Sequence, residues 1–224
     1  MNINMYTSIG EIPNISDDKD NIWVMSCDIG KRNFAVSICE YNIKTLQSYR
    51  QYMKNNEMSV ITDKICTNNK IVMMDLVDFV GYSNSIMSQD IYVNIVNYLD
   101  TIKPWLDLCS CFVLEKQIKR NPEAMSIEQH IYSYLIIKYN LEKERVRFPS
   151  KLKYSEMEFP NNIKKKYYRK KWACERIKSI LEKNKDKNAI DYIFTKNKTK
   201  KDDLSDTLLQ SYSFCKRIFV KEVI

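Results

Sequence analysis

The sequence predicts an α/β domain built on a mixed central sheet with an antiparallel hairpin and flanking helices. The first observation is a pair of apolar runs, 22–28 and 33–41, whose short connection around Gly30 allows only a hairpin. The second is that short apolar runs then alternate with segments of helical spacing, which is typical of α/β domains. With 224 residues, 44% of them hydrophobic, the chain can bury one sizeable core.

The predicted strands are short apolar runs bounded by polar or turn residues. In the second run, Phe34, Val36 and Ile38 alternate with smaller or polar residues, as in a strand that pairs with an antiparallel neighbour. The polar segment 42–69 has no clear periodicity, and its structure is left open. The predicted strands are 22–28, 33–41, 70–79, 109–115 and 145–148.

The predicted helices show apolar residues three and four positions apart. Pro104 is expected to stop the first helix, and Pro122 to open the second. In the last helix, Leu204, Leu208 and Tyr212 share one face. The predicted helices are 88–106, 122–140, 162–184 and 203–219.

The composition narrows the class of protein. The 36 Lys and Arg residues exceed the 28 Asp and Glu residues, which gives a net charge of +8 and a pI near 9.0. This balance permits an acidic partner such as nucleic acid, although a basic surface alone would also explain it. With 3 glycines and no glycine-rich phosphate loop, the sequence does not support a nucleotide-binding protein.

The ends and the cysteines indicate the domain organisation and the compartment. Residues 1–20 are predicted to form a flexible polar extension without the features of a signal peptide, and 21–224 a single folded domain. No apolar run is long enough to span a bilayer, so no membrane partner is expected. The 7 cysteines are odd in number and lack a C-x-x-C pair, which predicts reduced thiols in an intracellular, reducing compartment. The sole histidine, His130, is expected to be a helix-packing or surface residue.

Acidic residues end two of the predicted strands. Asp28 follows "WVMSC" and Glu115 follows "CFVL", and functional sites in open α/β sheets form at the carboxyl ends of strands. A third acidic group, "DDLSD", opens the last predicted helix. There Asp203 and Asp206 share a face at three-residue spacing, although Asp202 and Asp206 at four-residue spacing also can. We expect Asp202 to cap the helix, because acidic residues at helix starts commonly do so.

These carboxylates would repel one another if they converged without positive charge. A pair of divalent cations is the usual solution, and two such ions can clamp the attacking and leaving oxygens of a phosphoryl displacement. Mg²⁺ prefers carboxylate oxygens and keeps several waters, so it needs few protein ligands. The pattern therefore predicts a site for metal-dependent phosphoryl chemistry.

Three motifs carry a resemblance to a known family. "CDIGKRNFAVSI" resembles the first hairpin of RNase H-like nucleases, "FVLEKQ" the second-acid strand of RuvC-like Holliday junction resolvases, and "DDLSDTLLQ" their terminal helix. Order and residue types are most similar to the poxvirus and mitochondrial branch of that family, although the stretch between the first two acids is longer here. The resemblance implies an RNase H-like fold, with two Mg²⁺ or Mn²⁺ ions held by Asp28, Glu115, Asp203 and Asp206.

The resemblance also implies an essential lysine after the fifth strand. "RVRFPSKLKY" offers Lys151 and Lys153 there, and Lys151 is the preferred candidate. The basic stretch "KKKYYRKK" predicts DNA contact, because cations bind phosphates and aromatic rings can stack on open bases. Trp172 in the same helix is assigned to the core instead. The expected DNA-binding residues are Lys116, Arg120, Lys153, Lys164, Lys165, Arg169, Lys170 and Lys200.

The function that the resemblance implies is an endonuclease that resolves four-way DNA junctions. Two symmetrical cuts require two active sites, so we expect a homodimer, with the unusually apolar helix 122–140 at its interface. Three alternatives stay open: an RNase H-like nuclease acting on RNA–DNA hybrids or flaps, a transposase-like strand-transfer core, and a non-catalytic basic DNA-binding protein. Loss of cleavage with retained binding in an acid variant would separate the third alternative from the rest, and the choice among junction, hybrid and flap would separate the others.

Overall fold

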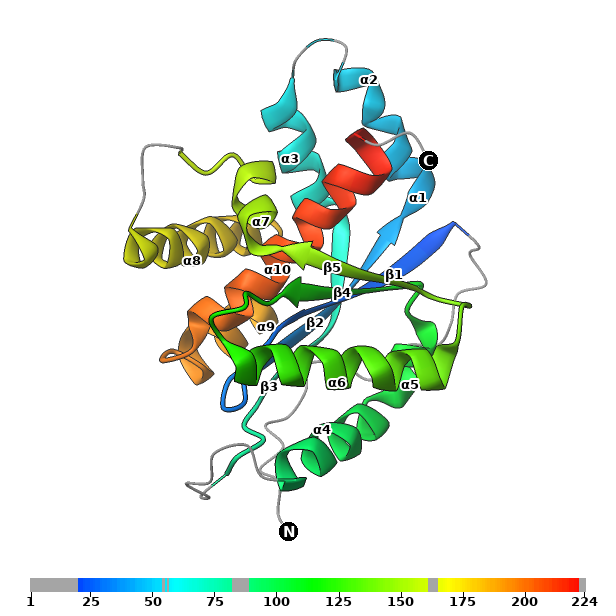
Figure 1. The fold of residues 1–224 in the computed structure, drawn as a ribbon. Helices are drawn as coiled ribbons and strands as arrows, with labels where there is room; N and C mark the ends of the chain where they lie inside the picture. Colours follow the sequence, from blue (N-terminus) through cyan, green and yellow to red (C-terminus); the bar gives the residue numbers. More distant parts are fainter. Residues whose placement is uncertain (1–19, 54, 56, 82–88, 161–164, 222–224) are drawn as a thin grey trace.

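A computed structural model describes residues 20–53, 55, 57–81, 89–160 and 165–221. The predicted extension 1–20 therefore lies outside the described residues except for Asp20. The predicted α/β class with a mixed sheet and flanking helices is confirmed (Figure 1).

Five strands form one sheet in the order β3-β2-β1-β4-β5. The β1–β2 and β2–β3 pairs are antiparallel, whereas β1–β4 and β4–β5 are parallel. All five predicted strands are present, with ends that differ by at most two residues from the prediction. The strands are β1 Asn21–Asp28, β2 Phe34–Asn42, β3 Asn69–Val77, β4 Cys111–Lys116 and β5 Glu144–Pro149.

Helical elements cover both faces of the sheet (Figure 1). The helices before β5 are α1 Ile43–Ser48, α2 Arg50–Met53, α3 Met58–Thr67, α4 Gln89–Thr101, α5 Lys103–Leu108 and α6 Pro122–Tyr139. The later elements are α7 Ser150–Glu156, α8 Lys166–Lys183, α9 Lys187–Ile190, the π-helix η1 Asp191–Lys196, α10 Lys201–Cys215 and the π-helix η2 Lys216–Lys221.

The helices depart from the sequence prediction in several ways, and α7, α9 and η1 were not predicted at all. The segment left open, 42–69, contains three short helices rather than a strand. The single predicted helix 88–106 is broken into α4 and α5, because Pro104 lies in the first turn of α5, where a proline without an N–H is tolerated. The last helix begins at Lys201, two residues before the predicted start, and changes into the π-helix η2 after Cys215.

The sheet separates two hydrophobic cores, because side chains along a strand alternate between its faces. In β1, Val24 faces the core that contains α3, α8 and α10, whereas Met25 and Cys27 face the core that contains α4 and α6. Asp28 has the parity of Val24, and Glu115 in β4 has the parity of Val113, which is also in the α10 core. Both acids therefore lie on the face that α10 covers.

Small residues allow α10 to lie close to the sheet. Ser26 and Ser37 are fully buried on paired positions of β1 and β2. On the helix, Ser211 is also fully buried, and its Oγ lies 2.8 Å from the hydroxyl of Tyr41 in β2. The amphipathic helix predicted from Leu204, Leu208 and Tyr212 is thus a central one, buried on nearly every side over residues 204–215.

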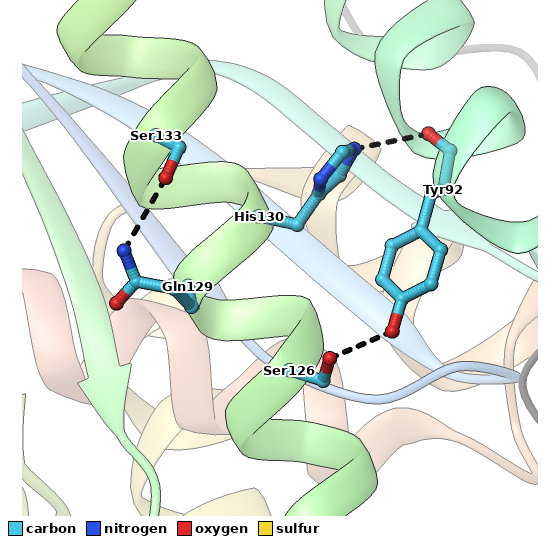
Figure 2. A pocket seen from close by; sticks show the side chains of 5 residues that line it. All are labelled: Tyr92, Ser126, Gln129, His130 and Ser133. Carbon is cyan, nitrogen blue, oxygen red and sulfur yellow. Dashed lines mark hydrogen bonds between the residues drawn. The ribbon is translucent and has the colours of Figure 1, made fainter.

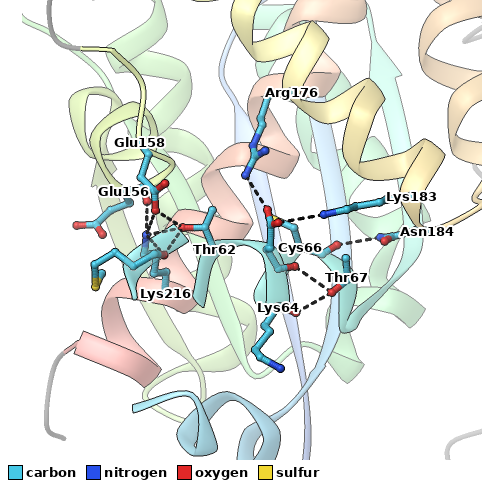
Figure 3. A network of polar contacts seen from close by, with 12 residues as sticks. Thr62, Lys64, Cys66, Thr67, Glu156, Glu158, Arg176, Lys183, Asn184 and Lys216 are labelled. Atoms are coloured by element: carbon cyan, nitrogen blue, oxygen red, sulfur yellow. Dashed lines mark hydrogen bonds and ion pairs between the residues drawn. The ribbon is translucent and has the colours of Figure 1, made fainter. Parts of the chain in front are cut away.

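A polar network fastens the end of α10 to α3 and α7 (Figure 3). The buried ammonium of Lys216 donates to Thr62 Oγ1 at 2.6 Å and to the backbone oxygen of Glu156 at 2.8 Å. It also forms an ion pair with Glu158 at 3.2 Å. Burial without these acceptors would be costly for an ammonium group, so the network fixes where the helix ends.

The seven cysteines are all buried and free, which agrees with the prediction of reduced thiols. Burial raises the pKa of the Cys39 and Cys66 thiols to about 12, so both stay protonated and unreactive at neutral pH. No helix in the described part of the chain is both long and apolar enough to cross a membrane.

Gln210 joins α10 to the two parallel strands that carry the acids. Its side-chain amide is 1% exposed and donates to the backbone oxygen of Cys27 at 3.2 Å and to that of Val113 at 3.0 Å. These carbonyls lie just before Asp28 and Glu115. One amide group therefore sets the distance between two strand ends and the helix.

We expect Gln210→Glu to lower the free energy of unfolding by about 2–4 kcal/mol, because two buried carbonyls lose their donor and a carboxyl replaces it. Burial would raise the pKa of the introduced carboxyl in the folded state. The deficit should therefore grow as the pH rises above about 4.3, the ordinary value of glutamate. Urea unfolding at pH 5 and pH 7.5 measures both effects.

The matched control is Gln129→Glu on the surface of α6, where the side-chain oxygen already accepts from Arg147 at 2.6 Å. That variant should unfold within about 0.5 kcal/mol of the parent protein. Equal stability of the two variants would show that the Gln210 amide does not tie the strands.

Candidate functional site

Asp28 and Glu115 lie side by side at the carboxyl ends of β1 and β4. The parallel register pairs Cys27 with Leu114, so the next residue of each strand carries the acid. The two carboxyl groups share a hydrogen bond. The sequence prediction that two strand-end acids meet is therefore correct in geometry.

Asp206 reaches this pair from the α10 helix through Lys153. The ammonium of Lys153 in α7 lies 2.8 Å from Oδ2 of Asp206 and 3.4 Å from Oε1 of Glu115. The hydroxyl of Tyr154, the next residue, donates to Asp206 at 3.1 Å. The carboxylate cluster, as we name Asp28, Glu115 and Asp206, thus surrounds one buried lysine.

The shared hydrogen bond shifts the pKa values of the two acids in opposite directions. Burial raises the pKa of Asp28 well above its usual range, and the neighbouring Glu115 carboxylate raises it further. Burial would also raise the pKa of Glu115, but the hydrogen bond from Asp28 and the charge of Lys153 outweigh it and hold that pKa at about 2. The two neighbouring carboxyls therefore differ in pKa, with that of Asp28 raised and that of Glu115 lowered.

The structure places Lys153, not the preferred Lys151, among the acids. Lys153 is 1% exposed, whereas Lys151 is exposed to solvent. Burial lowers the pKa of the Lys153 ammonium, but the charges of Asp206, Asp28 and Glu115 outweigh that effect and raise it well above its usual value. The expectation that Lys153 contacts DNA is wrong for this buried, fully paired side chain.

Asp202 does not cap α10 as expected. The helix begins at Lys201, so Asp202 lies in the first turn, and its carboxylate forms an ion pair with Lys170 of α8. Asp203 is 3.7 Å from the same ammonium. Burial, together with the charge of Asp202, raises the pKa of Asp203. Lys170, expected on the DNA surface, thus fastens α8 to the start of α10.

The donor set fits Mg²⁺ or Mn²⁺ in its chemistry, because these ions take carboxylate oxygens. Asp28 and Glu115 lie at neighbouring strand ends and are two of the residues that would hold such an ion. Among the described residues, however, no three acidic, histidine or cysteine side chains gather around a point that could hold a metal ion. Lys153 supplies the positive charge there, and Asp203 stands further out beside Lys170.

The remaining residues expected to bind DNA differ in exposure. Lys116, Arg120 and Lys165 are exposed, whereas Arg169 and Lys200 are partly buried. Lys164 lies outside the described residues. Trp172 packs against Phe159, with ring centroids 5.0 Å apart, so its assignment to the core is confirmed.

A shallow groove between α4 and α6 lies outside the carboxylate cluster (Figure 2). His130 lines it, with Nε2 at 3.2 Å from the backbone oxygen of Tyr92 and the two rings 4.9 Å apart. The Tyr92 hydroxyl lies 2.6 Å from Ser126 Oγ. These contacts join two helices and confirm that His130 is a packing residue.

Sequence reasoning missed Tyr154 and Gln210. Tyr154 sits in α7, a helix that was not predicted, so its orientation could not be inferred. Gln210 follows Asp206 by four residues and Asp203 by seven, so the three share one helical stripe that the acidic spacing already defined. Extending that stripe by one turn would have found it.

Comparison of the sequence with known proteins gives limited information. No family model matches the chain. The uncharacterized protein 170L of Invertebrate iridescent virus 6 is 25% identical over 229 residues, covering 87% of this chain and 89% of that protein. Because the function of that relative is not described, it does not add to the chemistry of the site.

Comparison with solved structures is more informative about the fold. The fowlpox virus resolvase in complex with its substrate Holliday junction DNA matches with a TM-score of 0.58 and 17% identity, covering 88% of this chain and 99% of that one. The yeast mitochondrial Holliday junction resolvase Ydc2 matches with a TM-score of 0.52 and 13% identity, covering 86% of this chain and 78% of that one. The chain therefore has the fold of the Holliday junction resolvases of the poxvirus and mitochondrial type, as its sequence motifs predict.

Proposed function

We propose that this protein is a metal-dependent endonuclease that cuts four-way DNA junctions. The observation that carries the proposal is the meeting of Asp28, Glu115, Asp206 and Lys153 from four separate elements, in a fold shared with Holliday junction resolvases. Convergence of buried acids on one lysine is costly for stability, and such arrangements occur where chemistry requires them.

Asp28, Glu115, Asp203 and Asp206 are the residues that would hold two Mg²⁺ or Mn²⁺ ions. When bound, such ions supply an activated water and stabilise charge on a scissile phosphate. Gln210 and Tyr154 are positioning residues, because they hold the strand ends and the Asp206 carboxylate without reaching solvent themselves.

Lys153 is the essential lysine in this proposal. Its ammonium balances the acids and donates to Oδ2 of Asp206, so it holds that carboxylate in position. α10 in turn fixes the Lys153 backbone, because Ser213 Oγ donates to its carbonyl at 2.8 Å. Lys151 on the exposed side of α7 has no such contacts.

Exposed basic residues beside the cluster are proposed to bind the DNA backbone. Lys116 directly follows Glu115 at the end of β4, and Lys165 precedes the first turn of α8, which contacts α10. Exposed Arg120 and partly buried Lys200 are further candidates for phosphate contact. Such cations release condensed counterions when they meet phosphates, so binding would weaken with salt.

We also propose a homodimer, because paired cuts in a junction need two sites. On α6 and the turn after it, Ile137 and Leu141 are 80% and 86% exposed, and Ile136 is 43% exposed. An apolar patch of this kind is typical of a subunit interface. Tyr139 does not belong to this patch, because it is buried and its hydroxyl donates to Asp107 in α5 at 2.9 Å.

Asp28→Asn should abolish cleavage of a synthetic four-way junction in Mg²⁺, because an amide is a poorer ligand for a divalent cation than a carboxylate, while junction affinity is retained. The assay compares the junction with linear duplex, an RNA–DNA hybrid and a flap. Retained cleavage at the rate of the parent protein would disprove the role of the carboxylate cluster. Preferred cleavage of the hybrid or the flap would support nuclease activity but assign it a different substrate.

Asp202→Asn is the matched control, since Asp202 pairs with Lys170 and is not one of the four proposed metal ligands. It should retain most cleavage, whereas Asp203→Asn should lose it. The reverse result would assign the ligand pair to Asp202 and Asp206.

Lys153→Met should abolish cleavage and lower stability by about 3 kcal/mol, because the buried acids lose their counter-charge. Lys151→Met should leave both unchanged. Thermal melts with and without Mn²⁺ separate the two effects, because an added cation should restore part of the melting temperature of Lys153→Met. Loss of activity in Lys151→Met alone would return the essential role to that residue.

Ile137→Glu combined with Leu141→Glu should convert a dimer to a monomer in sedimentation velocity, since two carboxylates cannot be buried unpaired in an interface. Val93→Glu on α4, where Val93 is 55% exposed, is the control and should not change the mass. A monomeric parent protein at micromolar concentration would contradict the proposal.

A further inference from the structure

Two adjacent tyrosines are exposed at the start of α8. Tyr167 is 71% and Tyr168 49% exposed, and their ring centroids lie 5.5 Å apart at an interplanar angle of 71°. Among the described residues they are the only aromatic side chains that are exposed. Their apolar faces are therefore presented to solvent, and neither belongs to a hydrophobic core.

A third aromatic residue of the same helix is not exposed to solvent. Trp172 turns inward and packs on Phe159 and Tyr154, with ring centroids 5.0 and 6.4 Å away. Tyr167 and Tyr168, by contrast, have each other as their aromatic contact. The core of this region is complete without them, so packing does not explain their presence.

The tyrosine pair directly precedes two residues of α8 that contact the surroundings of the carboxylate cluster. The next residue, Arg169, places its guanidinium 5.8 Å from the centre of the Tyr154 ring, and Tyr154 donates to Asp206. Lys170, one position further, forms an ion pair with Asp202 at the start of α10. The two residues after the pair therefore reach into the candidate site.

Positive charge surrounds the two rings. Lys165, Lys166 and Lys171 are all exposed, and no acidic residue lies in the first turn of α8. Exposed rings bordered by cations match single-stranded nucleic acid, because the cations track phosphates while each base offers a flat face for stacking. A fully stacked duplex offers phosphates but few free base faces.

We propose that Tyr167 and Tyr168 form a stacking surface for unpaired bases at the branch point of DNA, beside the carboxylate cluster. The inference rests on the proposed function and names the part of the substrate that this helix recognises. The lysines bind the backbone of any DNA, whereas the tyrosines select DNA whose bases are unstacked. The pair thus supplies preference for a branch over a duplex.

The test uses the full chain carrying Tyr167→Ala and Tyr168→Ala, in EDTA so that no strand is cut. Three probes are titrated over a range of salt: a four-way junction with 2-aminopurine at the branch, a linear duplex of the same sequence, and oligo-dT. Loss of one stacked base should weaken junction and oligo-dT binding by about tenfold. Duplex binding should not change, and the 2-aminopurine signal at the branch should lose its response to protein.

Two control variants separate stacking from charge and from folding. Tyr167→Phe with Tyr168→Phe keeps both ring faces and should bind all three probes like the parent protein. Lys165→Ala with Lys166→Ala should weaken all three and flatten the dependence of log K on log salt, by about 0.9 per lost duplex contact. The alanine pair at the tyrosines should leave that slope unchanged.

Three results would overturn the inference: unchanged junction and oligo-dT binding in the alanine variant, equal losses on junction and duplex, or the same loss in the phenylalanine variant. Failure of the proposed function is distinguishable. A parent protein that does not cut junctions in Mg²⁺, but binds oligo-dT through the tyrosines, would keep the stacking surface and discard the nuclease. A parent protein that cuts junctions, but whose DNA binding does not depend on the two tyrosines, would keep the nuclease and discard the stacking surface.

Discussion

The structure depends on one buried ammonium group. Lys153 lies between carboxylates from a β-strand and from the last long helix, and its burial would be unfavourable without them. Removal of either partner would leave a charge without compensation in the interior. The contacts therefore determine how α7 and α10 sit relative to β4, and the rest of the α10 face is arranged around them.

A single stripe along α10 organises the contacts. Asp203, Asp206, Gln210 and Ser213 follow one another at helical spacing, and together they meet α8, α7 and the sheet. Asp203 meets α8, Asp206 meets α7, Gln210 meets β1 and β4, and Ser213 holds the backbone of Lys153. The chemistry and the packing of this helix are consequently inseparable, because the same residues serve both.

The sequence could predict the strand-end acids because their signal is local. Asp28 and Glu115 each close a dense apolar run, and parallel strands bring such ends together whatever the loops between them do. The choice between Lys151 and Lys153, by contrast, depends on which face of α7 each residue occupies. The two differ by two positions on α7, about 200° around a helix, so one faces the acids and the other faces solvent. Without knowledge of that helix and its phase, the sequence could not decide.

Helix ends were predictable only approximately. The assignment of Asp202 as a cap failed because the helix begins at Lys201 and because Lys170, 32 positions earlier, pairs with that acid. Segment 42–69 was left open since its three helices are short and rely on packing against α10 and η2 rather than on their own periodicity. Contacts between distant segments decide such cases, and a single sequence does not display them.

The central place of α10 also has a consequence for how the protein is made. The ribosome delivers the chain in order, so all five strands emerge before this helix does. Until α10 has been made, no helix covers the sheet face that carries Asp28 and Glu115, and the small serines of β1 and β2 have no helix to pack against. For most of its synthesis, the nascent chain therefore exposes the sheet side chains that α10 later covers. A stop in translation before residue 201 would yield a chain that has both strand acids and no site.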